Sequence, residues 1–120
     1  MTKVIQVINN QPIIVMTSCP NLELAKDIAK ILVEKKLVAC AQLTRNVESI
    51  YEWQGQIESS TEVVLSLKTF RLHWETIQTQ IIKMHPYKIP EMIAVDMVNI
   101  SEKYEAWMRE VVNMTSDKEC

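Results

Sequence analysis

The stretch that decides the fold is VESIYEWQGQIESSTEVVLSL, residues 47–67, which holds the only glycine of the chain between two runs rich in β-formers. The turn Gln54-Gly55-Gln56 places this glycine where a tight hairpin needs a positive φ. One face of the returning strand is predicted to be buried, because three apolar residues alternate along it: Val63, Leu65 and Leu67. A β-hairpin that turns at Gly55 is therefore the first prediction.

The rest of the chain supplies two more strands and three helices. Apolar runs predict strands over 12–17 and 91–98, and apolar stripes at helical spacing predict helices over 22–36, 71–84 and 102–112. The order β-α-β-β-α-β is that of a ferredoxin-like α+β sandwich, with helices on one face of an antiparallel sheet and an extra C-terminal helix. We predict one domain over residues 1–120, with an ordered core of about 12–112 and a flexible tail, 113–120.

Helix ends and helix faces are also predicted from the residue types. Asn21 and Ser101 are suited to cap the first and third helices, and Pro86 ends the second one after His85. The helical stripes place three aromatic residues in the core: Trp74, Tyr104 and Trp107.

Composition excludes several classes of protein. The 120 residues are 48% apolar and carry a net charge of −2, with scattered basic residues, so no nucleic-acid surface is predicted. No apolar run reaches the roughly 18–20 residues of a membrane span, and residues 1–10 lack the apolar region of a signal peptide. Three widely spaced cysteines indicate neither a disulfide framework nor a closed zinc site. A cytoplasmic location is expected.

The predicted hairpin is longer than its own domain can cover. Arms of roughly 12 residues span about 40 Å, whereas a compact domain of this size has a radius of gyration of about 13–14 Å. The far end carries four large apolar residues, which we expect to pack against another copy of the chain: Ile50, Tyr51, Trp53 and Ile57. The alternative is a β-bulge that bends the arm back over its own domain.

Several segments in a fixed order resemble the signature segments of the CutA divalent-cation tolerance family. They run from about residue 13 to residue 112, nearly the whole chain, and the ordered set is more specific than any one tripeptide. The segments are Thr17-Ser18-Cys19-Pro20-Asn21, Leu37-Val38-Ala39-Cys40-Ala41, Ser49-Ile50-Tyr51-Glu52-Trp53-Gln54-Gly55, Glu62-Val63-Val64-Leu65, Leu67-Lys68-Thr69, His85-Pro86-Tyr87 and Pro90-Glu91.

The resemblance implies a ferredoxin-like homotrimer that is involved in metal homeostasis and binds copper or another divalent cation. It implies no catalytic activity and no organic cofactor. The sequence agrees, since it has no G-x-S-x-G, no glycine-rich phosphate loop and no two-histidine metal motif. Two alternatives stay open: a signalling trimer like the PII proteins, which binds a small anionic effector between subunits, and a structural or partner-binding trimer.

The metal ligands that the family implies are only partly present. Thr17 stands where copper-binding members have a cysteine, and Met84 where they have the first of two histidines. The remaining candidates are His85, Cys19 on the same turn as Thr17, and Glu91; together with Met84 they would bind the ion weakly. Thiolate and thioether suit Cu(I), whereas His85 and Glu91 suit a harder ion. The alternative is that Met84, Cys19 and His85 have structural roles.

Two further residues could line a cleft between subunits. Lys68 carries an ammonium group and Tyr87 a phenol, and the pair would suit an anionic ligand. The alternative is a solvated lysine and a packed tyrosine.

Overall fold

The computed structural model describes residues 9–115, which form one antiparallel sheet with the strand order β2-β3-β1-β4. β1 pairs with β3 on one side and with β4 on the other, so that Ile13 lies opposite both Thr69 and Asp96. This arrangement confirms the predicted ferredoxin-like α+β fold. The strands are β1 (Pro12–Cys19), β2 (Cys40–Trp53), β3 (Gln56–Phe70) and β4 (Ile93–Asp96).

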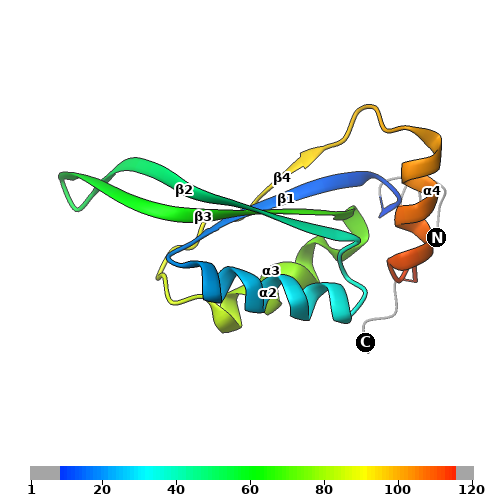
Figure 1. Cartoon of the computed structure of the whole chain (residues 1–120), viewed down its shortest axis with the longest axis horizontal. Helices are drawn as coiled ribbons and strands as arrows, with labels where there is room; N and C mark the ends of the chain where they lie inside the picture. The colour runs from blue at the N-terminus through cyan, green and yellow to red at the C-terminus, as the bar shows by residue number, and fades with distance from the viewer. Residues whose placement is uncertain (1–8, 116–120) are drawn as a thin grey trace.

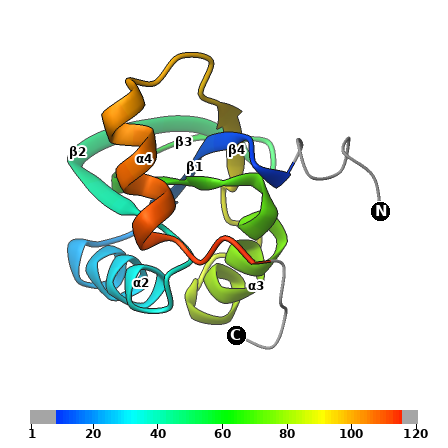
Figure 2. The ribbon, with the colours of Figure 1, turned by 90° about the vertical axis from the view of Figure 1, so that its right-hand side faces the viewer.

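Two helices cover one face of the sheet, and a third lies at its end. α2 (Leu22–Glu34) and α3 (Trp74–Met84) lie side by side beneath the strands, whereas α4 (Glu102–Val111) stands at the end away from the hairpin (Figures 1 and 2). The predicted caps are present: Asn21 Oδ1 accepts a hydrogen bond of 2.8 Å from the Leu24 N–H, and the Ser101 side chain accepts one from Tyr104. A 3₁₀ turn, Arg71–His73, precedes α3.

The hairpin of β2 and β3 extends beyond the helices that cover the rest of the sheet (Figure 1). Its two-residue turn has φ values of 52° at Gln54 and 81° at Gly55, as a type I′ turn requires. A β-bulge follows Thr44, where Asn46 has a φ of 60°, but it does not fold the arm back. The described part of the chain measures 47 × 28 × 27 Å. The predicted overhang is therefore confirmed.

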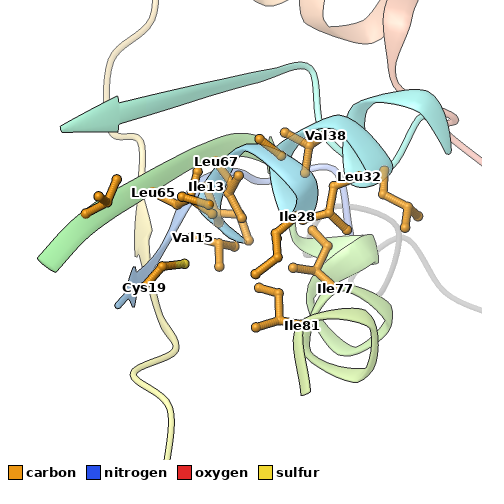
Figure 3. Close-up of a cluster of buried hydrophobic side chains, with 14 residues drawn as sticks. Ile13, Val15, Cys19, Ile28, Leu32, Val38, Leu65, Leu67, Ile77 and Ile81 are labelled. Carbon is orange, nitrogen blue, oxygen red and sulfur yellow. The ribbon is translucent and has the colours of Figure 1, made fainter. Parts of the chain in front are cut away.

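The main core lies between the sheet and the two helices that cover it. Ile13 and Val15 of β1 meet Leu65 and Leu67 of β3 there, and the opposite wall comes from α2 and α3: Ile28, Leu32, Ile77 and Ile81 (Figure 3). Each of these side chains is almost completely buried. A smaller cluster around Phe70 and Met108 holds α4 against the end of the sheet.

Two predicted details differ from the structure. Trp107 is not in the core: its side chain is 40% exposed, because α4 meets only the end of the sheet and has no second layer to cover this face. Tyr104 and Trp74 are partly buried against the two clusters. The last strand covers only Ile93–Asp96 rather than 91–98, since only these residues pair with β1. Of the tail predicted to be flexible, residues 116–120 lie outside the described residues.

Candidate functional site

A cleft of about 570 Å³ opens where the hairpin leaves the body of the domain. It is lined by Ile50, Tyr51 and Trp53 of β2 and, from the loop after α3, by Tyr87, Lys88, Ile89 and Glu91. Ser18, next to the last residue of β1, and Glu62 of β3 also line it. The cleft thus gathers residues from four segments that are far apart in the sequence.

Glu62 is the most unusual residue of the cleft, because this acidic residue is only 6% exposed. Its Oε2 accepts a hydrogen bond of 2.7 Å from the Tyr87 hydroxyl. This bond ties the loop after α3 to the root of the hairpin. Burial, and then the bond to Glu62, raise the pKa of Tyr87, so the phenol keeps its proton and remains the donor.

His85 anchors the same loop to the end of β1. Its side chain is 8% exposed, and its Nε2 donates to the Ser18 carbonyl at 2.7 Å. Because Nε2 carries the proton, Nδ1 is the acceptor for the Tyr87 N–H at 3.2 Å. The Tyr87 ring lies 4.7 Å away from the imidazole, centroid to centroid. Both ring nitrogens are therefore bonded to the backbone.

Two other residues at the end of β1 face the core. Cys19 is a fully buried free thiol at the edge of the main cluster, and burial, followed by the charge of Glu62, raises its pKa to about 11 (Figure 3). Thr17 is fully buried as well, and its Oγ1 has no hydrogen-bond partner among the described residues. In this arrangement Cys19 is a protonated thiol rather than a thiolate.

The four predicted metal ligands come from neighbouring segments but do not converge. His85 is bonded to Ser18, the residue before Cys19, and Cys19 itself belongs to the core. Met84 packs against the core and Glu91 lines the cleft. Within residues 9–115 no group of three or more His, Cys, Asp or Glu side chains could hold a metal ion. The four candidate ligands therefore do not form a metal-binding cluster within the described part of one chain.

The two predicted cleft residues lie apart, whereas three of the predicted interface residues, Ile50, Tyr51 and Trp53, line the cleft. Tyr87 lines the cleft, but the Lys68 ammonium lies 5.3 Å from the centroid of the Tyr104 ring, beside α4. Ile50 and Ile57 are 69% and 74% exposed on the hairpin. Glu62 was not predicted as a site residue, although it begins one of the segments that resemble the family and is an acid directly before a buried apolar run.

The fold and the cleft define the class of protein: a ferredoxin-like sandwich with an overlong hairpin and a cleft at its root. The profile of the family described as CutA1 divalent ion tolerance protein matches residues 13–111, and the chain belongs to this family.

Relatives of known name agree with this assignment. The divalent-cation tolerance protein CutA of Pyrococcus horikoshii is 39% identical over 98 residues, which are 82% of this chain and 95% of that protein. Human protein CutA is 38% identical over 100 residues, which are 83% of this chain but only 56% of the human one. The chain thus spans little more than half the length of this relative.

Solved structures of the family superpose closely on this fold. The divalent cation tolerance protein of Thermus thermophilus matches with a TM-score of 0.82 and 32% identity, over 85% of this chain and 99% of the other. CutA1 of Oryza sativa matches with a TM-score of 0.85 and 27% identity, over 90% and 99%.

The relatives differ in the compartment that their names give. The Arabidopsis thaliana protein is described as chloroplastic, and the Archaeoglobus fulgidus structure as periplasmic. Among residues 9–115 of this chain, no helix is long and apolar enough to cross a membrane.

Proposed function

We propose that this chain forms a homotrimer that contributes to divalent-cation tolerance by binding a metal ion weakly, with copper as the first candidate. The observation that carries the metal proposal is the hydrogen bond from His85 Nε2 to Ser18, which holds the imidazole beside the turn that carries Cys19. A thiolate and an imidazole are a donor pair that suits copper. Met84 and Glu91, on either side of His85 in the sequence, are the further donors.

Weak binding follows from the groups that the ion must displace. The Cys19 thiol must lose a proton although its pKa is raised to about 11, and His85 must give up one of its two hydrogen bonds to the backbone. The ion would thus be cargo rather than a structural component of the fold.

Calorimetric titration with Cu(I), Cu(II) and Zn(II) tests this proposal. Stoichiometric binding to the wild type is expected, with loss of affinity in Cys19→Ser and His85→Ala. Cys40→Ser is the matched control, since Cys40 begins β2 and lies outside the cleft. Thr17→Cys, which restores the thiol of the family pattern, should strengthen Cu(I) binding. No heat with any of the three ions would sink the metal proposal.

The trimer is supported by the exposed apolar end of the hairpin. Ile50, Tyr51, Trp53 and Ile57 are all exposed in the single chain, and a neighbouring subunit would cover them. Three chains of 13.9 kDa give about 42 kDa, which light scattering distinguishes from a monomer. A mass near that of one chain would refute the assembly.

We further propose that the protein is cytoplasmic and has no catalytic activity. Cys19 and Cys40 are free thiols, as is usual in a reducing compartment. The cleft has no nucleophile beside a base: the His85 nitrogens are both bonded to the backbone. Its size also fits the alternative of a trimer that responds to a small effector.

A further inference from the structure

The loop after α3 is fastened to the rest of the chain at few points. Residues 86–89 are all exposed, and both hydrogen bonds found for them within the described chain come from Tyr87. The Tyr87 hydroxyl donates to Glu62 of β3, and the backbone N–H of the same residue donates to Nδ1 of His85. Tyr87 thus joins the imidazole of His85 to the sheet.

The two ring nitrogens of His85 are not held equally. Nε2 donates to the Ser18 carbonyl over 2.7 Å, whereas the N–H of Tyr87 meets Nδ1 over 3.2 Å, at the long end of the range for hydrogen bonds. A carbonyl can only accept and an amide N–H can only donate, so these partners fix the tautomer with its proton on Nε2. Nδ1 therefore carries the lone pair, and its bond is the weaker of the two.

The lone pair on Nδ1 is the part of His85 that can bind a metal ion while the stronger bond is kept. Metal-binding histidines commonly donate their other ring N–H to a carboxylate or a backbone carbonyl, which orients the ring. The Ser18 carbonyl already accepts the Nε2 proton in this way. An ion on Nδ1 therefore needs only the N–H of Tyr87 to move away.

Glu62 determines how readily Tyr87 moves. Its carboxylate accepts the Tyr87 hydroxyl at 2.7 Å, and a hydrogen bond to an ionised acceptor is stronger than one between neutral groups. Glu62 lies in β3 opposite Val47 of β2, so this acceptor is fixed in the sheet. Tyr87 itself is 36% exposed, so its position depends on the bond to Glu62 more than on burial.

We propose that Glu62 and Tyr87 form a latch that covers Nδ1 of His85, and that release of Tyr87 from Glu62 makes this nitrogen available to a metal ion. The role in metal access rests on the proposed function, but the latch itself can be tested without metal. Glu62 and Tyr87 are positioning residues, because they act on the ion only through His85. The latch lies within one chain and includes none of the four hairpin residues that a neighbouring subunit would cover.

Hydrogen exchange of the metal-free protein tests the latch. Tyr87→Phe keeps the ring beside the imidazole but removes the hydroxyl, so the amide of residue 87 should exchange at least about tenfold faster than in the wild type. Glu62→Gln keeps a neutral acceptor and should give a smaller increase. Tyr104→Phe is the matched control, since Tyr104 lies on α4 and packs against the smaller cluster, and the amide of residue 87 should exchange as in the wild type. Nitrogen NMR of the wild type should show the His85 proton on Nε2.

Zn(II) is the probe for access to Nδ1, because it binds imidazole nitrogen and has no redox chemistry. Calorimetry should show an affinity for Zn(II) at least about tenfold higher in Tyr87→Phe than in the wild type, because a larger fraction of the protein has Nδ1 uncovered. Tyr104→Phe should bind Zn(II) as the wild type does. Circular dichroism and light scattering check that the variants fold and assemble as the wild type does.

The outcomes separate the latch from the metal proposal. Unchanged exchange of the amide of residue 87 in folded Tyr87→Phe, or a His85 proton on Nδ1, would overturn the latch. Faster exchange with an unchanged or lower affinity for Zn(II) would overturn its role in metal access. If no variant binds Zn(II), metal access fails together with zinc binding, and the exchange measurements still decide the latch. If Tyr87→Phe does not fold, Glu62→Gln and the His85 tautomer decide it.

Discussion

Thr17→Val should make the protein more stable, although it replaces a residue at the centre of the sheet. Thr17 is fully buried, and its hydroxyl has no hydrogen-bond partner among the described residues. A buried polar group without a partner costs about 1–3 kcal/mol. Valine has the same branched shape and replaces the hydroxyl by a methyl group that suits the core.

The expected gain is about 1–2 kcal/mol in the free energy of unfolding, because part of the penalty is relieved by small shifts of the surrounding atoms. For a domain of this size such a gain raises Tm by about 4–8 °C. Urea unfolding followed by circular dichroism measures it, with both proteins at one concentration because association contributes to the apparent stability.

Thr69→Val is the matched control with the opposite sign. Thr69 is also fully buried in a central strand, but its Oγ1 donates a hydrogen bond of 2.6 Å to the Leu37 carbonyl. Valine would leave that carbonyl without the hydroxyl and should cost about 1–3 kcal/mol. If Thr17→Val destabilised the protein as much as Thr69→Val, the Thr17 hydroxyl would have a partner and the reasoning would be refuted.

Substitutions at three other positions test separate parts of the fold. Burial lowers the pKa of His73 below 6.5, so the unfolded chain takes up the proton more readily. The contribution of His73 to stability should therefore be full above pH 6.5 and decrease as the pH falls below it. The urea midpoints measured at about pH 7.5 and about pH 5.5 should differ less in His73→Gln than in the wild type. Gly55→Ala should lower the free energy of unfolding by about 1 kcal/mol because Gly55 has a φ of +81°, although a Cβ there would meet nothing within 4 Å. Gly55→Asn should cost less, since asparagine tolerates this φ better than alanine. Equal unfolding midpoints for Gly55→Ala and the wild type would contradict this. Asn21→Ala should cost about 1 kcal/mol through loss of the bond to Leu24, with Asn21→Ser close to the wild type in thermal unfolding.

The fold was predictable because its signals are local. The glycine of the turn, the Asn21 cap and the alternation of Val63, Leu65 and Leu67 each depend on a few neighbouring residues, and each agrees with the structure. The exposure of Trp107 was not predictable in this way. A helical stripe indicates which side of a helix is apolar, but not whether another element covers it.

The site was less predictable because its geometry depends on distant contacts. Glu62 accepts a hydrogen bond from Tyr87, which follows 25 positions later, and no pattern within β3 indicates this. The same applies to His85, whose imidazole is hydrogen-bonded to the carbonyl of Ser18, 67 positions earlier in the chain. The sequence identified the segments that form the cleft, but not which side chains use their hydrogen-bonding groups within it.

The position of β1 has a consequence for the order in which the chain folds. β2 and β3 are joined by a two-residue turn, so they can pair as soon as both are synthesised. β1 emerges from the ribosome before either of its neighbours, and its pairing with β4 joins Ile13 to Asp96. Such long-range pairing is slow. Most of the chain must therefore be synthesised before the central strand has both partners, and until then a nascent chain carries Pro12–Cys19 as an incompletely paired apolar strand.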